Sequence, residues 1–258
     1  MSNLAQLTIS KNIATVTLNR PEKRNSITPE MMTELDSIFG SLETNDDVRF
    51  VIFTGVGDKA FSTGADLASF ASHDRDSVRR NWIPSGHRIY KRLAQLPQIT
   101  IALINGDALG GGLELALACD FKIAVDTARL GLPEVGIGTL PGWGGTGRLV
   151  DVVGVSRAKY LVLSGQIIDA QTAVEWGLLH HIYPIAEVEA GLTTLLAQLE
   201  KVSPVAQQIG KQLMSAFENK TNAEILEAIG GALTVTTEDL AEGIKSFSEK
   251  RPPKFKGK

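Results

Sequence analysis

The sequence predicts a layered α/β fold followed by a helical C-terminal region. In the first half of the 258-residue chain, β-rich runs alternate with segments of helical periodicity, which is typical of strands packed against helices. The run Ile99–Ile104 is largely apolar, as expected for a parallel strand covered on both faces. From Gly142 onward, helical signals dominate. We therefore expect an α/β core in residues 1–195 and a helical region in residues 196–258.

The chain opens with signals for a hairpin and then a helix. Leu4–Ser10 and Ile13–Leu18 are rich in β-formers, and the two-residue link between them favours a hairpin. Thr28, Pro29 and Glu30 supply an N-cap, a proline at the first helical position and an acid in the first turn. We therefore expect a helix that begins at residue 29.

The remaining elements are bounded by glycines, prolines and capping residues. Asp169 is followed by helix-forming residues and predicts a helix start there. Phe61–Phe70 is expected to be a glycine-containing loop that runs into a weak helix. The other expected strands are Val48–Thr54, Ile99–Ile104 and Phe121–Val125, and the other expected helices are Trp82–Leu96, Leu113–Cys119, Pro204–Phe217, Asn222–Thr234 and Asp239–Ser248.

Composition argues against several classes of function. The net charge of −3 gives no electrostatic footprint for nucleic acid. No apolar stretch approaches ~18 residues, so no membrane span is expected. Cys119 is the single cysteine, which excludes an intrachain disulfide and, with no signal-peptide features at the start, fits a cytoplasmic location. The four histidines show no metal-ligand spacing, so no metal is expected.

The stretch that says most about chemistry covers residues 104–116. A strand ends at Ile104, three glycines follow at 110–112, and a helix begins. Backbone N–H groups at a helix start are unpaired, and glycines allow close approach to them. This turn could therefore hold an anion or a developing oxyanion. Glycines for tight strand–helix packing explain the pattern equally well.

Two other stretches carry weaker signals. Residues 59–67 follow a strand and a glycine turn and could offer a second backbone N–H, although on its own an ordinary loop is the simpler interpretation. Glu134 lies among apolar residues and glycines. A desolvated carboxylate there would have a raised pKa suited to acid–base chemistry, and a salt-bridged structural glutamate is the alternative.

Taken together, these stretches resemble the crotonase (enoyl-CoA hydratase/isomerase) superfamily. Ile101–Asp120 is similar to the central signature of that family, Leu18–Asn25 and Phe247–Pro252 extend the resemblance, and it covers about Leu4 to Lys256. The resemblance implies a spiral of ββα units that forms two near-perpendicular sheets, with a helical C-terminal trimerisation region. It also implies a homotrimer or homohexamer.

The resemblance assigns roles to four residues. Ala65 and Gly111 correspond to the backbone donors of an oxyanion hole, which holds a thioester carbonyl as it becomes an enolate. Glu114 and Glu134 correspond to the two glutamates of hydratases in the family. Glu114 is expected to activate water for attack at C3, and Glu134 to donate a proton to C2. The implied activity is that of an enoyl-CoA hydratase, a lyase of fatty acid metabolism.

The substrate implied by the resemblance is an acyl-CoA, in which coenzyme A is part of the substrate. No separate cofactor is expected. Cationic loop residues suit the CoA phosphates, although loop lysines and arginines are more often simply solvated. The expected acyl-CoA contacts are Lys23, Arg24, Ser26, Ser62, Gly64, Asp66, Leu67, Gly110 and Trp143.

Trp143 and Gly147 depart from the family pattern. Trp143 stands where a small residue or phenylalanine is usual, and it could shorten the acyl pocket, stack on an unusual acyl group or pack in a subunit interface. Gly147 stands where glutamine is common. Isomerisation, thioester hydrolysis and C–C cleavage therefore stay open as alternative reactions. The negative net charge disfavours RNA binding, and the intact acids and hole positions argue against a non-catalytic scaffold.

Overall fold

The computed structural model describes residues 3–218, 229–231 and 233–258. The chain forms two compact units, residues 1–96 with 100–188 and residues 97–99 with 189–258. The boundary predicted after residue 195 lies inside α8 (Val188–Leu199). The helix predicted at Asn222–Thr234 lies largely outside the described residues, and the described residues 229–231 and 233–235 are helical.

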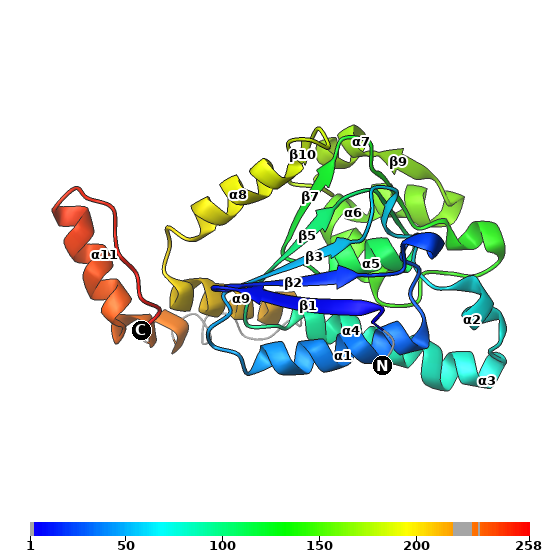
Figure 1. Ribbon diagram of the computed structural model, residues 1–258, viewed down its shortest axis with the longest axis horizontal. Helices are drawn as coiled ribbons and strands as arrows, with labels where there is room; N and C mark the ends of the chain where they lie inside the picture. The colour runs from blue at the N-terminus through cyan, green and yellow to red at the C-terminus, as the bar shows by residue number, and fades with distance from the viewer. Residues whose placement is uncertain (1–2, 219–228, 232) are drawn as a thin grey trace. The chain divides into compact units, whose positions relative to one another are not determined.

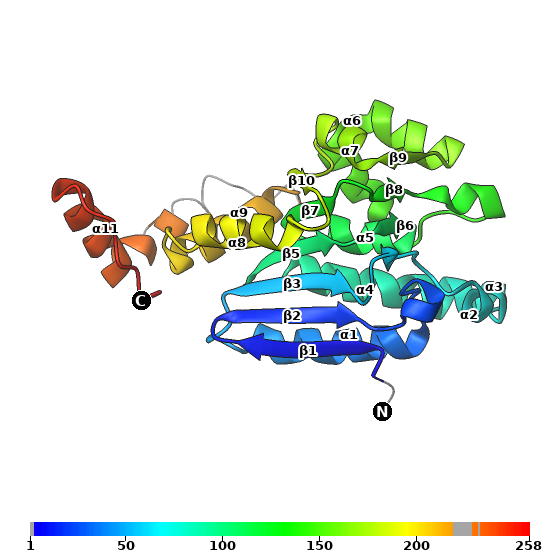
Figure 2. The same ribbon diagram turned by 45° about the horizontal axis from the view of Figure 1, so that its top comes forward.

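A six-stranded sheet has the order β1-β2-β3-β5-β7-β10. β1 and β2 are antiparallel, with Ser10 opposite Ile13 at the turn, so the predicted hairpin is confirmed. β2 pairs with β3, β5 with β7, and β7 with β10, all in parallel, and Figure 2 shows β1, β2 and β3 side by side. The strands are β1 (Ala5–Ser10), β2 (Ile13–Leu18), β3 (Phe50–Gly55), β5 (Ile99–Ile104), β7 (Phe121–Val125) and β10 (His181–Tyr183).

A second, four-stranded sheet has the order β4-β6-β8-β9. Its strands are only three residues long, β4 (Ala60–Ser62), β6 (Asp107–Leu109), β8 (Arg129–Gly131) and β9 (Ile167–Asp169). Runs this short show no measurable alternation of apolar and polar residues, so the sequence did not predict them. The presence of two sheets together with helices confirms the predicted α/β class.

Helices accompany the strands in the order expected for an α/β fold. Figure 1 shows α1 and α4 along one face of β1, β2 and β3. No helix in the described part of the chain combines the length and apolarity needed to cross a membrane. The helices of the first unit are η1 (Pro21–Lys23), α1 (Pro29–Glu43), α2 (Leu67–Ala71), α3 (Arg75–Ser77), the π-helical η2 (Val78–Trp82), α4 (Ile83–Ala94), α5 (Gly111–Leu117), η3 (Pro133–Ile137), α6 (Gly145–Ser164) and α7 (Ala170–Glu175), and α8, α9 (Pro204–Glu218) and α11 (Glu238–Ser248) follow.

Helix α1 forms as its sequence predicts. The Thr28 hydroxyl accepts a hydrogen bond of 3.3 Å from the Met31 N–H, which caps the helix. Leu35 and Phe39 follow at helical spacing and are fully buried, and the Phe39 ring meets Phe53 of β3 edge-on at 5.7 Å between centroids. Burial of each such side chain stabilises the fold by about 1.5–3 kcal/mol.

The buried side chain of Asn25 ties together three loops near the ends of the strands. Asn25 is 1% exposed and has a positive φ of 54°, a conformation that asparagine tolerates better than most residues. Its Oδ1 accepts a bond of 2.9 Å from the Arg20 N–H. Its Nδ2 donates to the carbonyls of Val56 at 3.1 Å and Ala60 at 2.8 Å. These bonds fix the loops that carry the cavity described below.

We expect Asn25→Ala to lower the free energy of unfolding substantially. The substitution leaves the buried Ala60 carbonyl, the partly buried Val56 carbonyl and the partly buried Arg20 N–H without their partner, and a buried unsatisfied group costs about 1–3 kcal/mol. Urea denaturation followed by circular dichroism measures the change. Asn81→Ala, at an exposed position, is the matched control and should change stability by less than about 0.5 kcal/mol. Equal stabilities for the two variants would contradict this account.

Candidate active site

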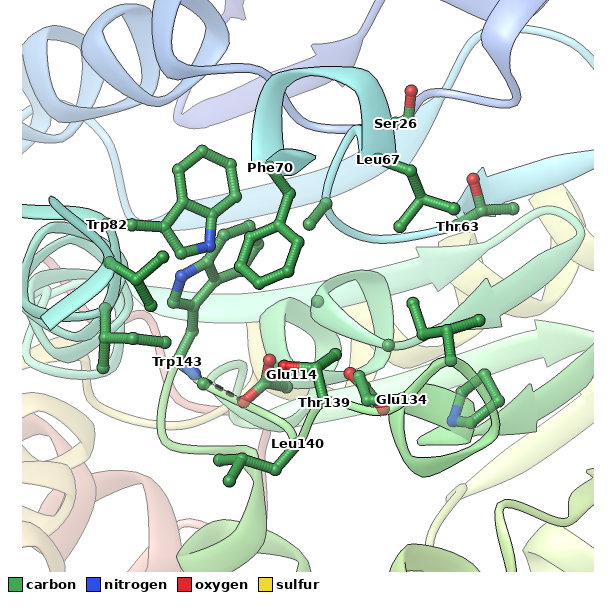
Figure 3. A pocket seen from close by; sticks show the side chains of 18 of the residues that line it. Ser26, Thr63, Leu67, Phe70, Trp82, Glu114, Glu134, Thr139, Leu140 and Trp143 are labelled. Atoms are coloured by element: carbon green, nitrogen blue, oxygen red, sulfur yellow. Dashed lines mark hydrogen bonds between the residues drawn. The ribbon is translucent and has the colours of Figure 1, made fainter. Parts of the chain in front are cut away.

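A cavity of about 720 Å³ opens in the first unit. Figure 3 shows Phe70, Trp82 and Trp143 on one side of it, and Ser26 and Thr63 on another. Nine residues predicted to contact the substrate or catalyse the reaction line this cavity: Lys23, Ser26, Ala65, Leu67, Gly110, Gly111, Glu114, Glu134 and Trp143. The lining residues that the sequence did not predict are Thr63, Phe70, Val78, Trp82, Ile83, Pro133, Gly136, Ile137, Thr139, Leu140 and Gly142.

The backbones of Ala65 and Gly111 approach each other closely at the cavity wall. A Cβ atom placed on Gly111 would lie 3.4 Å from the Ala65 nitrogen. The bridge between this loop and Ile27 uses the carbonyl of Gly64 and the N–H of Asp66, so it leaves the intervening Ala65 N–H unused. Gly111 is the first residue of α5, where a helix provides no acceptor for the N–H. Two backbone donors are therefore available side by side.

Glycines are required for this approach. Gly64 has a φ of 84°, and a Cβ atom on it would lie 2.5 Å from the Gly111 nitrogen. Gly110 has a φ of 53°, a conformation that glycine adopts without strain. A side chain on Gly112 would overlap the Ser62 carbonyl. The glycine run therefore serves both close packing and exposure of backbone donors, the two interpretations that the sequence left open.

Glu114 extends from α5 to the floor of the cavity. Its Oε1 accepts hydrogen bonds from the backbone N–H groups of Trp143 at 2.8 Å and Gly145 at 2.7 Å. The residue is 1% exposed, and burial raises the pKa of its carboxyl, while the backbone donors oppose that rise. A side chain on Gly145 would overlap the Cγ of Glu114. Because residue 145 is glycine, its backbone N–H can come close enough to donate a hydrogen bond to this carboxylate.

Glu134 lies on η3, next to Glu114 in the view of Figure 3. Its Oε1 packs against Gly110, where a Cβ atom would lie 3.0 Å away. Its Oε2 is buried and has no hydrogen-bond partner within the described part of the chain. Burial raises the pKa of Glu134 to about 7, and the nearby charge of Glu114 adds to the rise. Unlike a salt-bridged structural glutamate, this carboxyl is poised to exchange a proton near neutral pH.

Ser62 and Gly64 were predicted as substrate contacts but do not line the cavity. Ser62 is fully buried. Its hydroxyl donates to the Asn25 carbonyl at 2.8 Å and accepts from the Gly64 N–H at 3.1 Å. Both residues therefore hold the turn that carries Ala65 in place, and a direct contact of either with substrate stays a prediction.

Asp66 and Arg24 also lie outside the cavity lining. Asp66 caps α2 by accepting from the Ser69 N–H at 2.9 Å, and it pairs with Arg20 at 2.6 Å. The hydrogen bond from Arg20 holds the pKa of the Asp66 carboxyl well below its usual range. Arg24 has an exposed side chain, and its carbonyl accepts from the Thr63 N–H at 3.2 Å. Their predicted contacts with CoA likewise stay predictions.

Three aromatic side chains form one side of the cavity. Trp143 meets Trp82 at 5.4 Å between ring centroids, and Trp82 meets Phe70 at 5.9 Å. Tyr90 supports Trp143 from behind at 5.5 Å and donates its hydroxyl to the Gly111 carbonyl at 2.9 Å. Phe70 and Trp82 lie in segments that were predicted as a weak helix and a helix, and neither residue was predicted to contact the substrate.

Comparison with known families identifies the chain. The model of the enoyl-CoA hydratase/isomerase family matches residues 8–258. The chain belongs to this family. The predicted resemblance is therefore confirmed, while the roles of the two N–H groups and the two glutamates stay predictions.

Relatives of known name extend over almost the whole chain. A short-chain-enoyl-CoA hydratase of Clostridium acetobutylicum is 35% identical and covers 93% of this chain and 92% of its own. A 2,3-dehydroadipyl-CoA hydratase of Escherichia coli is 34% identical and covers 99% of this chain and 100% of its own. The crystal structure of an enoyl-CoA hydratase from Bacillus anthracis superposes with a TM-score of 0.93 at 35% identity, covering 99% of this chain and 100% of that one.

The raised pKa of Glu134 predicts that stability depends on pH. The folded-state pKa of about 7 lies above the ordinary value of 4.5, so the folded protein binds this proton more tightly than the unfolded chain. The stability that this proton contributes is fully present below about pH 4.5 and is lost as pH rises from there through about 7. We expect Glu134→Gln, which mimics the protonated acid, to raise Tm at about pH 8 and to change it little near pH 5.

Thermal unfolding followed by circular dichroism across this pH range measures the effect. Glu187→Gln is the control, because Glu187 is exposed and its substitution should leave the pH dependence of Tm as in wild type. A Tm difference for Glu134→Gln that is the same at both ends of the range would contradict the raised pKa.

Proposed function

We propose that the protein is an enoyl-CoA hydratase, a hydro-lyase that adds water reversibly to a 2-enoyl-CoA thioester. The observation that carries this proposal is the pairing of two desolvated glutamates with two converging backbone N–H groups in one cavity. Hydration needs a base for water, an acid for C2 and a stabiliser for the intermediate enolate. The four groups supply all three.

The thioester carbonyl oxygen would lie between the N–H groups of Ala65 and Gly111. As water adds at C3, the electrons of the C2–C3 double bond move toward the carbonyl, and negative charge develops on its oxygen. Fixed donors aimed at that oxygen stabilise the charge without reorganisation, and one such donor contributes about 2.7–4 kcal/mol in enzymes of other families. The two turns can approach each other because they carry glycines. Both N–H groups are therefore already in position before the substrate binds.

Glu114 suits the role of the base. The backbone bonds from Trp143 and Gly145 both fall on Oε1 and hold the carboxylate in place beside the cavity. The same bonds favour the ionised form that a base requires, while burial makes that form more basic. The water would lose one proton to Glu114 as its oxygen bonds to C3.

Glu134 suits the role of the acid. With a pKa of about 7, a large share of the carboxyl is protonated at neutral pH and can transfer its proton to C2 as the enolate collapses. After one turnover Glu114 holds the proton of the water and Glu134 is ionised, so exchange with solvent restores the starting state. In the reverse direction the same two groups exchange roles.

The mouth of the cavity suits coenzyme A. Lys23 and Ser26 line it, and the exposed ammonium of Lys23 is available to a phosphate. Coenzyme A would enter as part of the substrate, with no separate cofactor. A homotrimer or homohexamer and a cytoplasmic location, both expected from the sequence, complete the proposal.

Loss of the conjugated thioester absorbance of crotonyl-CoA tests the proposed reaction. We expect fast loss with wild type and a fall in kcat of about 10²–10⁴-fold in Glu114→Gln and in Glu134→Gln, the range that general acid–base groups contribute. Glu187→Gln should retain wild-type rates. Binding of acetyl-CoA without loss of absorbance would indicate isomerisation, hydrolysis or C–C cleavage instead, and absence of acyl-CoA binding would overturn the whole assignment.

The two directions of the reaction should share one pH profile. Each active form holds a single proton on the pair of carboxyls, on Glu134 for hydration and on Glu114 for dehydration, and the overall reaction releases no proton, so kcat/KM in both directions should fall as pH rises through about 7. Initial rates with crotonyl-CoA and with 3-hydroxybutyryl-CoA give the two profiles. A hydration kcat/KM that does not fall as pH rises through this range would exclude Glu134 as the proton donor to C2.

A further inference from the structure

Trp143 occupies the space between α4 and α5 directly beside Gly111, and its place there depends on two glycines. A Cβ atom on Gly86 of α4 would overlap the indole at Cδ1, and one on Gly111 would overlap its six-membered ring. The indole therefore reaches from one helix to the other. At 2% exposure it is almost wholly enclosed, so it fills this gap completely.

The indole of Trp143 also lies close to the position proposed for the thioester. Gly111 supplies one of the two backbone donors for the thioester oxygen, and the same residue is in contact with the six-membered ring of Trp143. Acyl carbons only a few bonds beyond the thioester therefore meet the indole. Trp82, which also lines the cavity, meets Trp143 at 5.4 Å between centroids, so the aromatic wall continues beyond the indole.

The aromatic side of the cavity carries no charge. Among the lining residues that the structure describes, the charged ones are Lys23, Glu114 and Glu134. Glu114 and Glu134 are engaged in the reaction, and Lys23 lies with the polar residues at the mouth. A terminal carboxylate on the acyl group would lose its hydration beside the aromatic rings without gaining a cation, which is strongly unfavourable.

We propose that Trp143 ends the acyl pocket and restricts this site to short, uncharged acyl groups. The inference rests on the proposed function for the placement of the thioester. The proposal distinguishes the substrate of this chain from that of its 2,3-dehydroadipyl-CoA hydratase relative. An adipyl group carries a free carboxylate at the end away from the thioester. Within the acyl-CoA class, residue 143 is then a specificity-determining residue.

Binding of saturated acyl-CoA esters to the full-length protein tests the inference without requiring turnover. Calorimetric titration with butyryl-CoA, decanoyl-CoA and adipyl-CoA gives three dissociation constants. For wild type we expect decanoyl-CoA and adipyl-CoA to bind at least about tenfold more weakly than butyryl-CoA. Trp143→Leu should open the gap between α4 and α5 and bring the decanoyl-to-butyryl ratio to about one or below, while adipyl-CoA stays weak because no cation is introduced.

Two controls separate pocket length from general damage. Trp176→Leu removes a tryptophan whose ring meets that of Tyr160 edge-on, with 6.0 Å between the ring centroids. This variant should leave the three affinities unchanged. Gly86→Ala should push the indole toward the substrate and weaken butyryl-CoA relative to acetyl-CoA in wild type, but not in the Trp143→Leu background. Gly147→Ala, where a Cβ atom meets nothing within 4 Å, is the matched glycine control. If Trp143→Leu does not fold, the comparison of Gly86→Ala with Gly147→Ala, both in the wild-type background, carries the test.

Several results would overturn the inference. Decanoyl-CoA bound by wild type as tightly as butyryl-CoA would show that long chains leave the cavity past Ile137 and Leu140, which are exposed. Adipyl-CoA bound as tightly as butyryl-CoA would contradict the exclusion of charge. A folded Trp143→Leu with an unchanged ratio would remove Trp143 from specificity. Selective binding without hydration of crotonyl-CoA would instead refute the proposed reaction and leave the pocket assignment standing.

Discussion

The close approach of two backbone turns is the constraint on which the site depends. Gly64 and Gly111 come so near that a single added Cβ atom would reach the opposite nitrogen. This contact brings two N–H groups from chain segments far apart in the sequence to one point. The buried hydrogen bonds of Asn25 and Ser62 hold one of the turns against the strand ends. Two adjacent N–H donors are thus supplied by main-chain atoms alone, and side chains contribute by keeping the turns together.

Desolvation is the second physical effect that shapes the site, and it acts differently on the two glutamates. Glu114 is fully enclosed but gripped by two backbone donors, which compensate the charged form. Glu134 is only half-buried, yet its Oε2 has no partner among the described residues and it lies near the charge of Glu114. Burial thus raises the pKa of both carboxyls, and backbone donors from Trp143 and Gly145 oppose that rise at Glu114.

Much of the first unit was predictable from local sequence signals. The β1–β2 hairpin, the capped start of α1 and strands β5 and β7 were all predicted, because each has either a turn, a cap or an apolar run of five or six residues. The strands of the second sheet were not, since three residues show no periodicity. Cross-strand pairing with distant segments, rather than local propensity, makes β6 and β8 extended.

The site was predictable only through the family resemblance. Spacing alone could not distinguish a salt-bridged Glu134 from a desolvated one, because the burial of its Oε2 and the lack of a partner for it among the described residues appear only in the folded chain. Asp66 is the opposite case. It was predicted to contact the substrate, and in the structure its carboxylate caps α2 and pairs with Arg20. Phe70 and Trp82 were missed for a related reason: their sequence pattern fits helix packing, and the folded chain turns them toward the cavity.

Trp143 connects the constraint on the backbone with the choice of substrate. Gly64 must lack a side chain so that its turn can meet Gly111, and Gly111 must lack one because the indole of Trp143 occupies the space that its Cβ atom would take. Gly86 makes the matching space on α4. Because Trp143 contributes its main-chain N–H to Glu114 and only its side chain to the pocket wall, catalysis and pocket shape are carried by different atoms of one residue. The size of residue 143 can therefore change the acyl pocket while the grip on Glu114 is kept.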